Sequence, residues 1–390
     1  MDEASTLPRR ASLGVGLREE DGGVRVTRVV PGSMGEAAGM RAGDVLVALD
    51  GAPVRAVEDA RAFVRGRFEA ATIAFARDGS RREARVARVP FPVEPVPGAT
   101  VRLGHVTVDA LDGARLRTLT TVPDDAAPDD GARHPAVLFV PGVRCASVDL
   151  ALAPDAPIAR IVRGLAATGL ATMRLERSGI GDSEGPPADR VGFVDEHAAY
   201  RAALEALARA PDVDPDRVFV YGHSVGGMHA ALLAHEAPLA GAVVYGSTAR
   251  RWSACLRDGL RRQMRLRGAR EDAVAAAVAD FDARFGDDGA YERSAAFHRE
   301  LDAAGLEDAW SRADVPLLVL AGEHDWVVGD EPRDLAALAR RAELVVLDGL
   351  DHAFTRHGSL EASLRDYGRG GAFDPRLIDV PARWMRGLTG

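Results

Sequence analysis

A short apolar run in the middle of the chain ends at residues able to perform nucleophilic chemistry. Residues 218–221 are β-branched or aromatic, Gly-His-Ser-Val-Gly follows at 222–226, and the Ala- and Leu-rich stretch 229–237 predicts a helix. In such a strand-to-helix turn the serine hydroxyl projects outward, and the two glycines give the backbone room to bend. Ser224 is therefore a candidate nucleophile; the alternative interpretation is a Gly-rich turn without chemistry.

The same turn also supplies a backbone N–H group that can stabilise negative charge during a reaction at Ser224. Val225 begins the expected helix, where a backbone N–H has no acceptor within the helix. Such an N–H can receive the negative charge that develops on a carbonyl oxygen under attack. The nucleophile and one candidate oxyanion donor thus come from one turn.

The surrounding sequence alternates between apolar strands and helix-forming segments. Continuous apolar strands between amphipathic helices indicate a mostly parallel sheet covered on both faces. An antiparallel hairpin over residues 101–122 precedes this sheet. The expected strands lie at 136–140, 171–177, 241–246, 315–321 and 342–347, and the expected helices at 156–167, 194–210 and 331–341.

With a serine at the turn, residues 100–390 resemble the α/β-hydrolase superfamily. The resemblance implies an α/β fold and catalytic partners in the order serine, acid, histidine. Asp325 follows an apolar strand in a Gly-x-x-Asp arrangement, and His352 lies in the loop after the next strand. His352 would accept the hydroxyl proton, and Asp325 would orient the imidazole. The reserve candidates for the acid are Glu323 and Asp351.

In this superfamily a second oxyanion donor comes from the loop after a central strand, here residues 141–147. Many relatives have His-Gly where this chain has Pro-Gly, but a donor that is the backbone N–H of Val143 does not depend on side-chain identity. Cys145 is a rival nucleophile, yet it lacks the strand-to-helix turn and is interpreted as a small packed residue. The segment 176–185 resembles the family's Gly-x-Gly-x-Ser-x-Gly loop and is expected to be structural.

Residues 249–314 interrupt the alternation of strands and helices at the place where α/β-hydrolases often carry a helical lid. Lids usually set substrate choice by shape and by excluding water. Seven arginines lie between positions 250 and 267. They would either grip a substrate carboxylate or balance neighbouring acidic residues on a solvated face.

The first ninety residues are short strands punctuated by glycine. The segment 39–46 matches the signature Gly-Leu-x-x-Gly-Asp-x-Ile, and Pro-Gly-Ser precedes it at 31–33. Residues 11–89 therefore resemble a PDZ domain of the bacterial type. Residues 90–99 contain four prolines and predict a semi-rigid linker to the second domain.

The PDZ resemblance implies that a peptide C-terminus adds as a strand beside residues 24–30 or 15–18. Its carboxylate would bind the backbone amides of a glycine-containing loop. An alternative is a degenerate domain that serves only packing or dimerisation. The loop residues are Leu13, Gly14, Val15 and Gly16.

Composition excludes several other classes of function. A net charge of −9 argues against a nucleic-acid partner. All 49 basic residues are arginine, so chemistry through a lysine Schiff base is excluded. Two cysteines cannot form a disulfide framework or, alone, a metal site. Without a signal-like N-terminus or an apolar stretch of about 18 residues, we expect a soluble, cytoplasmic protein with no membrane span.

The sequence thus predicts a serine hydrolase that cleaves an ester or thioester, or an amide, through an acyl-enzyme. Its partner would be a small-molecule acyl substrate, and neither a metal nor an organic cofactor is implied. One alternative is a peptidase whose PDZ-like domain recruits peptide C-termini, and another is a non-catalytic adaptor or scaffold. Acyl transfer to an acceptor other than water would use the same three residues.

Overall fold

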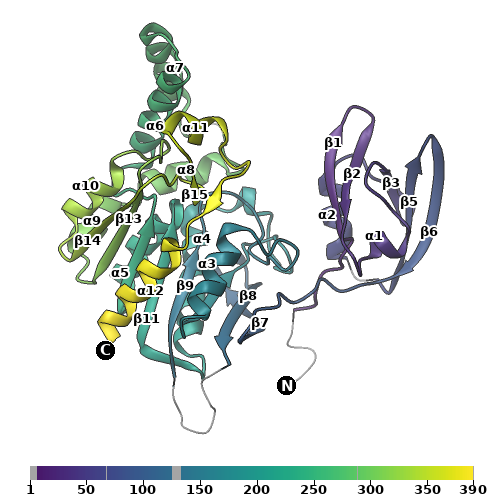
Figure 1. Ribbon diagram of the computed structural model, residues 1–390, viewed down its shortest axis with the longest axis horizontal. Coiled ribbons are helices and arrows are strands. Elements are labelled where there is room, and N and C mark those ends of the chain that lie inside the picture. The colour runs from purple at the N-terminus through teal and green to yellow at the C-terminus, as the bar shows by residue number, and fades with distance from the viewer. Residues whose placement is uncertain (1–6, 67, 125–132, 288, 390) are drawn as a thin grey trace. The chain divides into compact units, whose positions relative to one another are not determined.

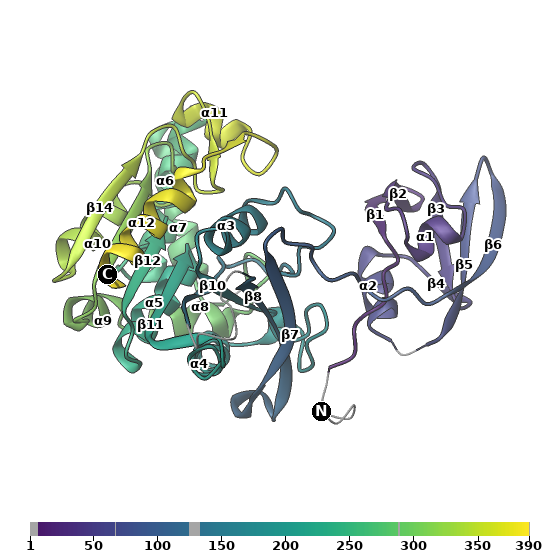
Figure 2. The ribbon, with the colours of Figure 1, turned by 60° about the horizontal axis from the view of Figure 1, so that its bottom comes forward.

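The computed structural model describes residues 7–66, 68–124, 133–287 and 289–389. The chain divides into two compact units, shown in Figures 1 and 2. The first runs to Glu94 and includes residues 150–154, and the second comprises the rest. Among the described residues, no helix is long and apolar enough to cross a membrane.

The first unit is an antiparallel sheet with two short helices, and its strand order is β1-β2-β3-β5-β6, with β4 paired to β3. Strand β2 is therefore flanked on both sides, whereas β1 is an edge. Apolar residues of the strands and both helices form its core. The strands are β1 (Val15–Glu20), β2 (Gly23–Val29), β3 (Val45–Leu49), β4 (Ala52–Pro53), β5 (Ala70–Arg77) and β6 (Ser80–Ala87), and the helices are α1 (Met34–Ala37) and α2 (Val57–Arg65).

The second unit contains an eight-stranded sheet of order β14-β13-β12-β11-β9-β10-β8-β7. In this order, all neighbouring strands from β14 to β10, including β9, pair in parallel. Strand β8 pairs antiparallel with both β7 and β10. The strands are β7 (Ala99–Val108), β8 (Ala114–Pro123), β9 (His134–Val140), β10 (Ala171–Leu175), β11 (Val213–His223), β12 (Gly241–Tyr245), β13 (Leu317–Gly322) and β14 (Ala342–Leu347).

Helices cover both faces of this sheet because successive side chains of a strand point to opposite faces. In β9, Leu138 packs in one core and its neighbours Val137 and Phe139 pack in the other. Helices α4, α5 and α10 contribute to the first core, and α3 and α12 to the second. These helices are α3 (Pro157–Ala166), α4 (Phe193–Ala208), α5 (Val225–Glu236), α10 (Glu331–Leu338) and α12 (Arg376–Thr389).

A helical insertion separates β12 from β13, and it is drawn in green in Figure 1. It contains α6 (Trp252–Leu266), α7 (Glu271–Arg284), α8 (Ala295–Asp302) and α9 (Leu306–Arg312). The smaller elements are the 3-10 turns η2 (Asp109–Leu111) and η3 (Ala188–Arg190), β15 (Thr355–Arg356), α11 (Leu360–Arg365) and β16 (Ala372–Phe373). The predicted fold class, a mostly parallel sheet with a helical insertion preceded by a small β-rich domain, is confirmed.

Candidate active site

Ser224 lies at a sharp turn between β11 and α5. Its backbone has φ 54° and ψ −122°, a conformation that only close packing maintains for a residue with a side chain. A Cβ on Gly222 would overlap the backbone of Gly226, and a Cβ on Gly226 would overlap the carbonyl of Val140. The flanking glycines therefore provide space, as the sequence predicted, while the serine itself has the unusual φ.

His352 and Asp325 form a direct hydrogen bond. His352 Nδ1 lies 2.8 Å from Asp325 Oδ2. The other carboxylate oxygen, Oδ1, accepts the N–H groups of Val327 at 3.0 Å and Val328 at 3.2 Å. An ionised carboxylate only accepts, so Nδ1 carries the proton in this bond and Nε2 of a neutral His352 is a lone-pair base.

The His352 and Asp325 pair lies beside the turn that carries Ser224. The Ser224 N–H donates to the carbonyl of Tyr245, at the end of β12, over 2.9 Å. At the next residue, Gly246, a Cβ would lie only 2.9 Å from His352 Nδ1 and 3.0 Å from Asp325 Oδ2. Three segments far apart in sequence thus meet at the carboxyl ends of adjacent parallel strands.

His223, the residue before Ser224, also contacts the histidine loop, which sequence reasoning did not predict. Its Nε2 lies 2.9 Å from the carbonyl oxygen of His352 and must carry the proton to donate. The pKa of His223 is lowered to about 3, mainly by burial and secondly by the nearby His352. The position is unspecified within the Gly-x-Ser-x-Gly pattern, so no motif indicates this contact.

The two reserve acids have other partners. Glu323 Oε2 accepts the N–H of Gly349 at 2.8 Å. Asp351 accepts the N–H groups of Ala353 and Thr355, at 2.9 and 2.8 Å. The geometry therefore favours Asp325 over both as the partner of His352.

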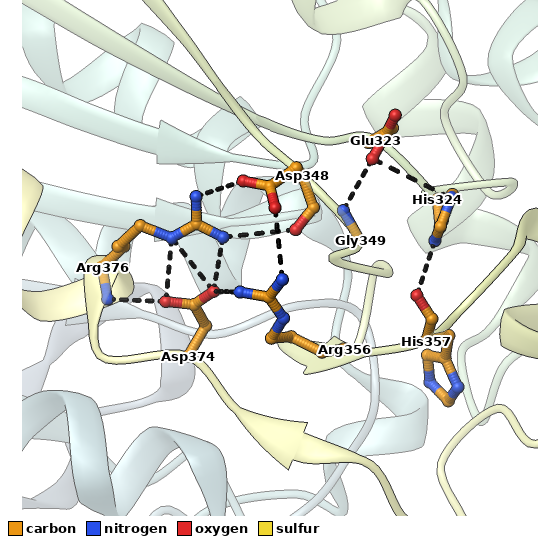
Figure 3. A network of polar contacts seen from close by, with 8 residues as sticks. All are labelled: Glu323, His324, Asp348, Gly349, Arg356, His357, Asp374 and Arg376. Atoms are coloured by element: carbon orange, nitrogen blue, oxygen red, sulfur yellow. Dashed lines mark hydrogen bonds and ion pairs between the residues drawn. The ribbon is translucent and has the colours of Figure 1, made fainter.

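A polar network holds the segments on either side of the histidine loop (Figure 3). Asp374 accepts hydrogen bonds from Arg356 at 2.9 Å and from Arg376 at 2.6 Å. Both arginines also bind Asp348, four residues before His352. The network thus connects the end of β14 to the start of α12.

The two candidate oxyanion donors come from the serine turn itself and from the loop after β9. A Cβ on Gly142 would lie 3.2 Å from the Cβ of Ser224, so the loop after β9 passes directly beside the serine. In the described part of the chain, the backbone N–H groups of Val143 and Val225 donate to no protein acceptor. Both therefore remain candidate oxyanion donors.

Cys145 lies in the same loop, and its environment does not activate it. Its Sγ donates to the carbonyl oxygen of Glu292 at 3.0 Å. Burial is the largest influence on its pKa and raises it, which lowers the thiolate fraction. Across the described residues, no group of three or more His, Cys, Asp or Glu side chains could hold a metal ion.

The arginines at the start of the insertion mostly bind groups of this chain. Arg262, for example, donates to the carbonyls of Trp326 at 3.0 Å and Val327 at 2.7 Å, directly after Asp325. This arrangement favours internal charge balance over recognition of a substrate carboxylate. The other pairs are Arg250 with Asp258 and Glu331, Arg251 with Asp302, Arg257 with Asp282, Arg261 with Asp258, and Arg265 with Glu271.

In the first unit, the candidate peptide-binding loop leads into the edge strand β1. Gly14 has φ 63°, and its carbonyl accepts the N–H of Val30 at 2.7 Å. The carbonyl of Leu13 accepts the N–H of Gly35 at 2.9 Å. No acceptor within the described ranges binds the N–H of Leu13 or of Gly14.

Comparison with known families identifies both parts of the chain. The alpha/beta hydrolase family matches residues 137–361, which is more than half of the chain, and the PDZ domain family matches residues 25–73. The chain therefore belongs to the alpha/beta hydrolase family and carries an N-terminal PDZ domain.

Individual relatives are distant. The chain is similar to the esterase EstD of Thermotoga maritima, with 26% identity over 291 residues that cover 72% of this chain and 66% of the relative, just under two thirds. Among solved structures it resembles a hypothetical protein of Pseudomonas aeruginosa, with a TM-score of 0.52, 15% identity, and 76% and 96% of the two chains covered. It also resembles Est1E of Butyrivibrio proteoclasticus with ferulic acid bound, with a TM-score of 0.50, 17% identity, and 73% and 99% covered. At these identities, the two solved structures show a shared fold and nothing further.

Proposed function

We propose that this protein is a serine esterase that works through an acyl-enzyme at Ser224. The observation that carries the proposal is the 2.8 Å bond between His352 and Asp325 beside the strained turn at Ser224. Geometry of this kind supplies a nucleophile, a base and an orienting carboxylate together.

In the acylation step, Ser224 Oγ attacks the ester carbonyl carbon while its proton passes to His352 Nε2. The carbonyl π electrons move onto oxygen, and the N–H groups of Val143 and Val225 stabilise this oxyanion. When the oxyanion collapses, the bond to the alkoxy group breaks and the alkoxy oxygen takes the proton from His352. Asp325 stabilises the imidazolium that forms in between.

Deacylation repeats these events with water as the nucleophile. His352 Nε2 accepts a proton from water, whose oxygen attacks the acyl carbon. Collapse of the second oxyanion breaks the bond to Ser224 Oγ, which regains the proton from His352. The products are a carboxylic acid, an alcohol and free enzyme.

The similarity to the esterase EstD favours an ester as the substrate. A thioester, and less readily an amide, could react through the same steps. Acyl transfer to an acceptor other than water would differ only in deacylation. The helical insertion, which we assign to residues 249–314, would act as the lid that selects the acyl group.

For the first domain, which we assign to residues 11–89 with a linker at 90–99, we propose binding of a peptide C-terminus. Two features support this role: the N–H groups of Leu13 and Gly14, for which the described residues provide no acceptor, and the position of β1 at the sheet edge. A peptide strand would add beside β1, because β2 is flanked by strands on both sides. Docking of the enzyme on a partner would leave the ester pocket to small molecules, whereas a peptidase would cleave the peptide recruited here.

The proposal is tested by turnover of p-nitrophenyl acetate and of matched thioester and peptide substrates. Ser224→Ala should lose at least about 10⁴-fold in kcat on every substrate that the wild type cleaves. Ser311→Ala is the matched control, because its hydroxyl donates only to the carbonyl of Asp308 within α9. Unchanged turnover in Ser224→Ala would refute the assignment, and preferred cleavage of peptides would favour the peptidase.

A further inference from the structure

The loop that presents Val143 is bound by charged side chains through its own backbone. Four successive carbonyl oxygens, from residues 141 to 144, accept hydrogen bonds from guanidinium groups. Arg177 donates to Pro141 at 3.3 Å, to Gly142 at 2.6 Å and to Arg144 at 2.9 Å. Arg293 Nε donates to the carbonyl of Val143 at 2.7 Å.

A buried carboxylate joins the two arginines. Glu196 lies 3.1 Å from Arg177 Nε and 2.7 Å from Arg293 Nη2. All three side chains are at least 96% buried. Burial is the largest influence on the pKa of Glu196 and would raise it, but both guanidinium groups oppose this effect and the net pKa is lowered. The carboxylate therefore stays ionised and holds both cations in place.

The bond from Arg177 to the Gly142 carbonyl fixes the direction of the Val143 N–H, whereas the bond from Arg293 to the Val143 carbonyl holds the following peptide. In a trans peptide the carbonyl of one residue and the N–H of the next point in opposite directions. With the Gly142 carbonyl held by Arg177, the Val143 N–H must point away from this arginine. Rotation of the peptide would break the 2.6 Å bond and leave a buried guanidinium donor without its acceptor.

Arg293 comes from the helical insertion and not from the sheet. It closes a tight turn with Ala290, in which Tyr291 and Glu292 have φ values of 53° and 62°. Glu292 also binds the loop, through Arg144 Nη2 at 2.8 Å and the Cys145 N–H at 3.2 Å. Such a strained turn persists where its surroundings determine it, and here the surroundings are the loop after β9.

We propose that Arg177, Glu196 and Arg293 form a clamp that positions the oxyanion donor Val143, and that the insertion completes this clamp through Arg293. The proposal rests on the serine esterase function proposed above. Arg177 and Arg293 are positioning residues, because they act on the reaction through the loop backbone. The oxyanion site is thus complete only when the turn at residues 290–293 is docked.

The test uses Arg293→Lys and Arg177→Lys in the full chain. A lysine keeps the charge opposite Glu196, but one ammonium cannot reproduce the spread of bonds that each guanidinium makes. We expect folded proteins in which kcat for p-nitrophenyl acetate falls at least about tenfold, with more loss for Arg177→Lys, while KM changes less than about twofold. Arg117→Lys is the matched control, since Arg117 is a buried arginine paired with Asp182 at 3.2 Å.

Two inhibitors distinguish a misplaced oxyanion donor from a general loss of order in the active site. A trifluoromethyl ketone forms a tetrahedral adduct with a serine and needs the oxyanion site, whereas the matching methyl ketone binds only as a substrate mimic. Binding of the trifluoromethyl ketone should weaken by the same factor as kcat/KM, and binding of the methyl ketone should not change. Equal weakening of both inhibitors, or wild-type kcat in folded Arg293→Lys and Arg177→Lys, would overturn the clamp.

The same experiment distinguishes failure of the clamp from failure of the proposed esterase. If the wild type cleaves the ester in a manner that depends on Ser224 and the lysine variants behave like the wild type, the clamp alone is wrong. If wild-type turnover survives in Ser224→Ala, the proposed esterase function is wrong, and the clamp with it.

Discussion

The two units of the chain offer their ligands different parts of a β-sheet. All ten histidines, both cysteines, all five tyrosines and all four tryptophans lie beyond residue 94. The first unit thus lacks the side chains that most often act in catalysis, and its candidate site is an edge strand preceded by amides that no described residue accepts. The second unit places side chains at the ends of parallel strands, where a reaction can use their protons. Binding by backbone and catalysis by side chain should therefore respond to different substitutions.

The largest effect should come from Asp325→Asn. The N–H groups of Val327 and Val328 would hold the asparagine oxygen, so its NH₂ would face His352 Nδ1 and could not accept the Nδ1 proton. The imidazole would then lose the orientation that leaves Nε2 as a base. We expect kcat to fall about 10⁴-fold with little change in peptide binding by the first unit. Steady-state kinetics would measure this loss, with the exposed Asp314→Asn as control. A loss in kcat of less than about tenfold would contradict Asp325 as the residue that orients His352 and would assign that role to another group.

The reciprocal change is Gly14→Ala in the first unit. Gly14 has φ 63°, and a Cβ there would overlap the side chain of Ser33. The loop should deform, and the affinity for peptides with a free C-terminal carboxylate should fall at least about tenfold, while ester turnover stays unchanged. Fluorescence anisotropy with a library of such peptides and their C-terminal amides would measure this.

The control for Gly14→Ala is Gly79→Ala, which has a similar φ of 76° but open space around its Cβ. Equal loss of affinity in both variants would mean that backbone strain, and not the loop, explains the result. If amidated peptides bind as tightly as free ones, the first unit does not recognise a carboxylate.

A smaller effect on kcat is expected from Arg376→Met, which removes the bonds of Arg376 to Asp348 and Asp374 from the network in Figure 3. The Arg376 side chain is 34% exposed, so water can replace part of what is lost. We expect a fall of about threefold to tenfold in kcat, less than for Arg177→Lys, because the histidine keeps its bond to Asp325. A greater loss than in Arg177→Lys would reverse the ranking of the two networks.

The smallest effect concerns pH and stability. Burial, partly opposed by Glu196, lowers the pKa of His229 to about 4, below the value of about 6.5 expected when the chain is unfolded. As pH falls from about 6.5 to 4, the unfolded state binds a proton that the folded state does not, so stability decreases. One such group contributes at most about 1.4 kcal/mol per pH unit.

Urea unfolding followed by tryptophan fluorescence reports on the second unit, because all four tryptophans lie there. His229→Gln should make the loss of stability between pH 6.5 and 4.5 shallower than in the wild type. His235→Gln, an exposed position on the same helix, should leave the slope unchanged. Identical slopes in all three proteins would show that His229 does not titrate as described.

The fold and the candidate triad could be predicted because their signals are local. Apolar strands followed by Ser224, Asp325 or His352 indicate where each residue meets the sheet edge. The role of Arg293 could not be predicted, because its contact with Val143 joins positions 150 residues apart. Its partner Glu196 lies inside an ordinary helical pattern, where nothing in the sequence indicates a buried ion pair. Local patterns predict elements and their ends, whereas contacts between insertions and loops depend on packing in three dimensions.

The central claim is that Ser224 is the nucleophile, and a fluorophosphonate probe tests it most directly. Trypsin cuts this lysine-free chain only after arginine, so Ser224 falls in the fragment 218–250, which mass spectrometry can sequence. We predict one adduct, on Ser224, which is lost in Ser224→Ala and strongly slowed in His352→Gln. A folded wild type without an adduct, or an adduct on Ser247 or Cys145, would contradict the account.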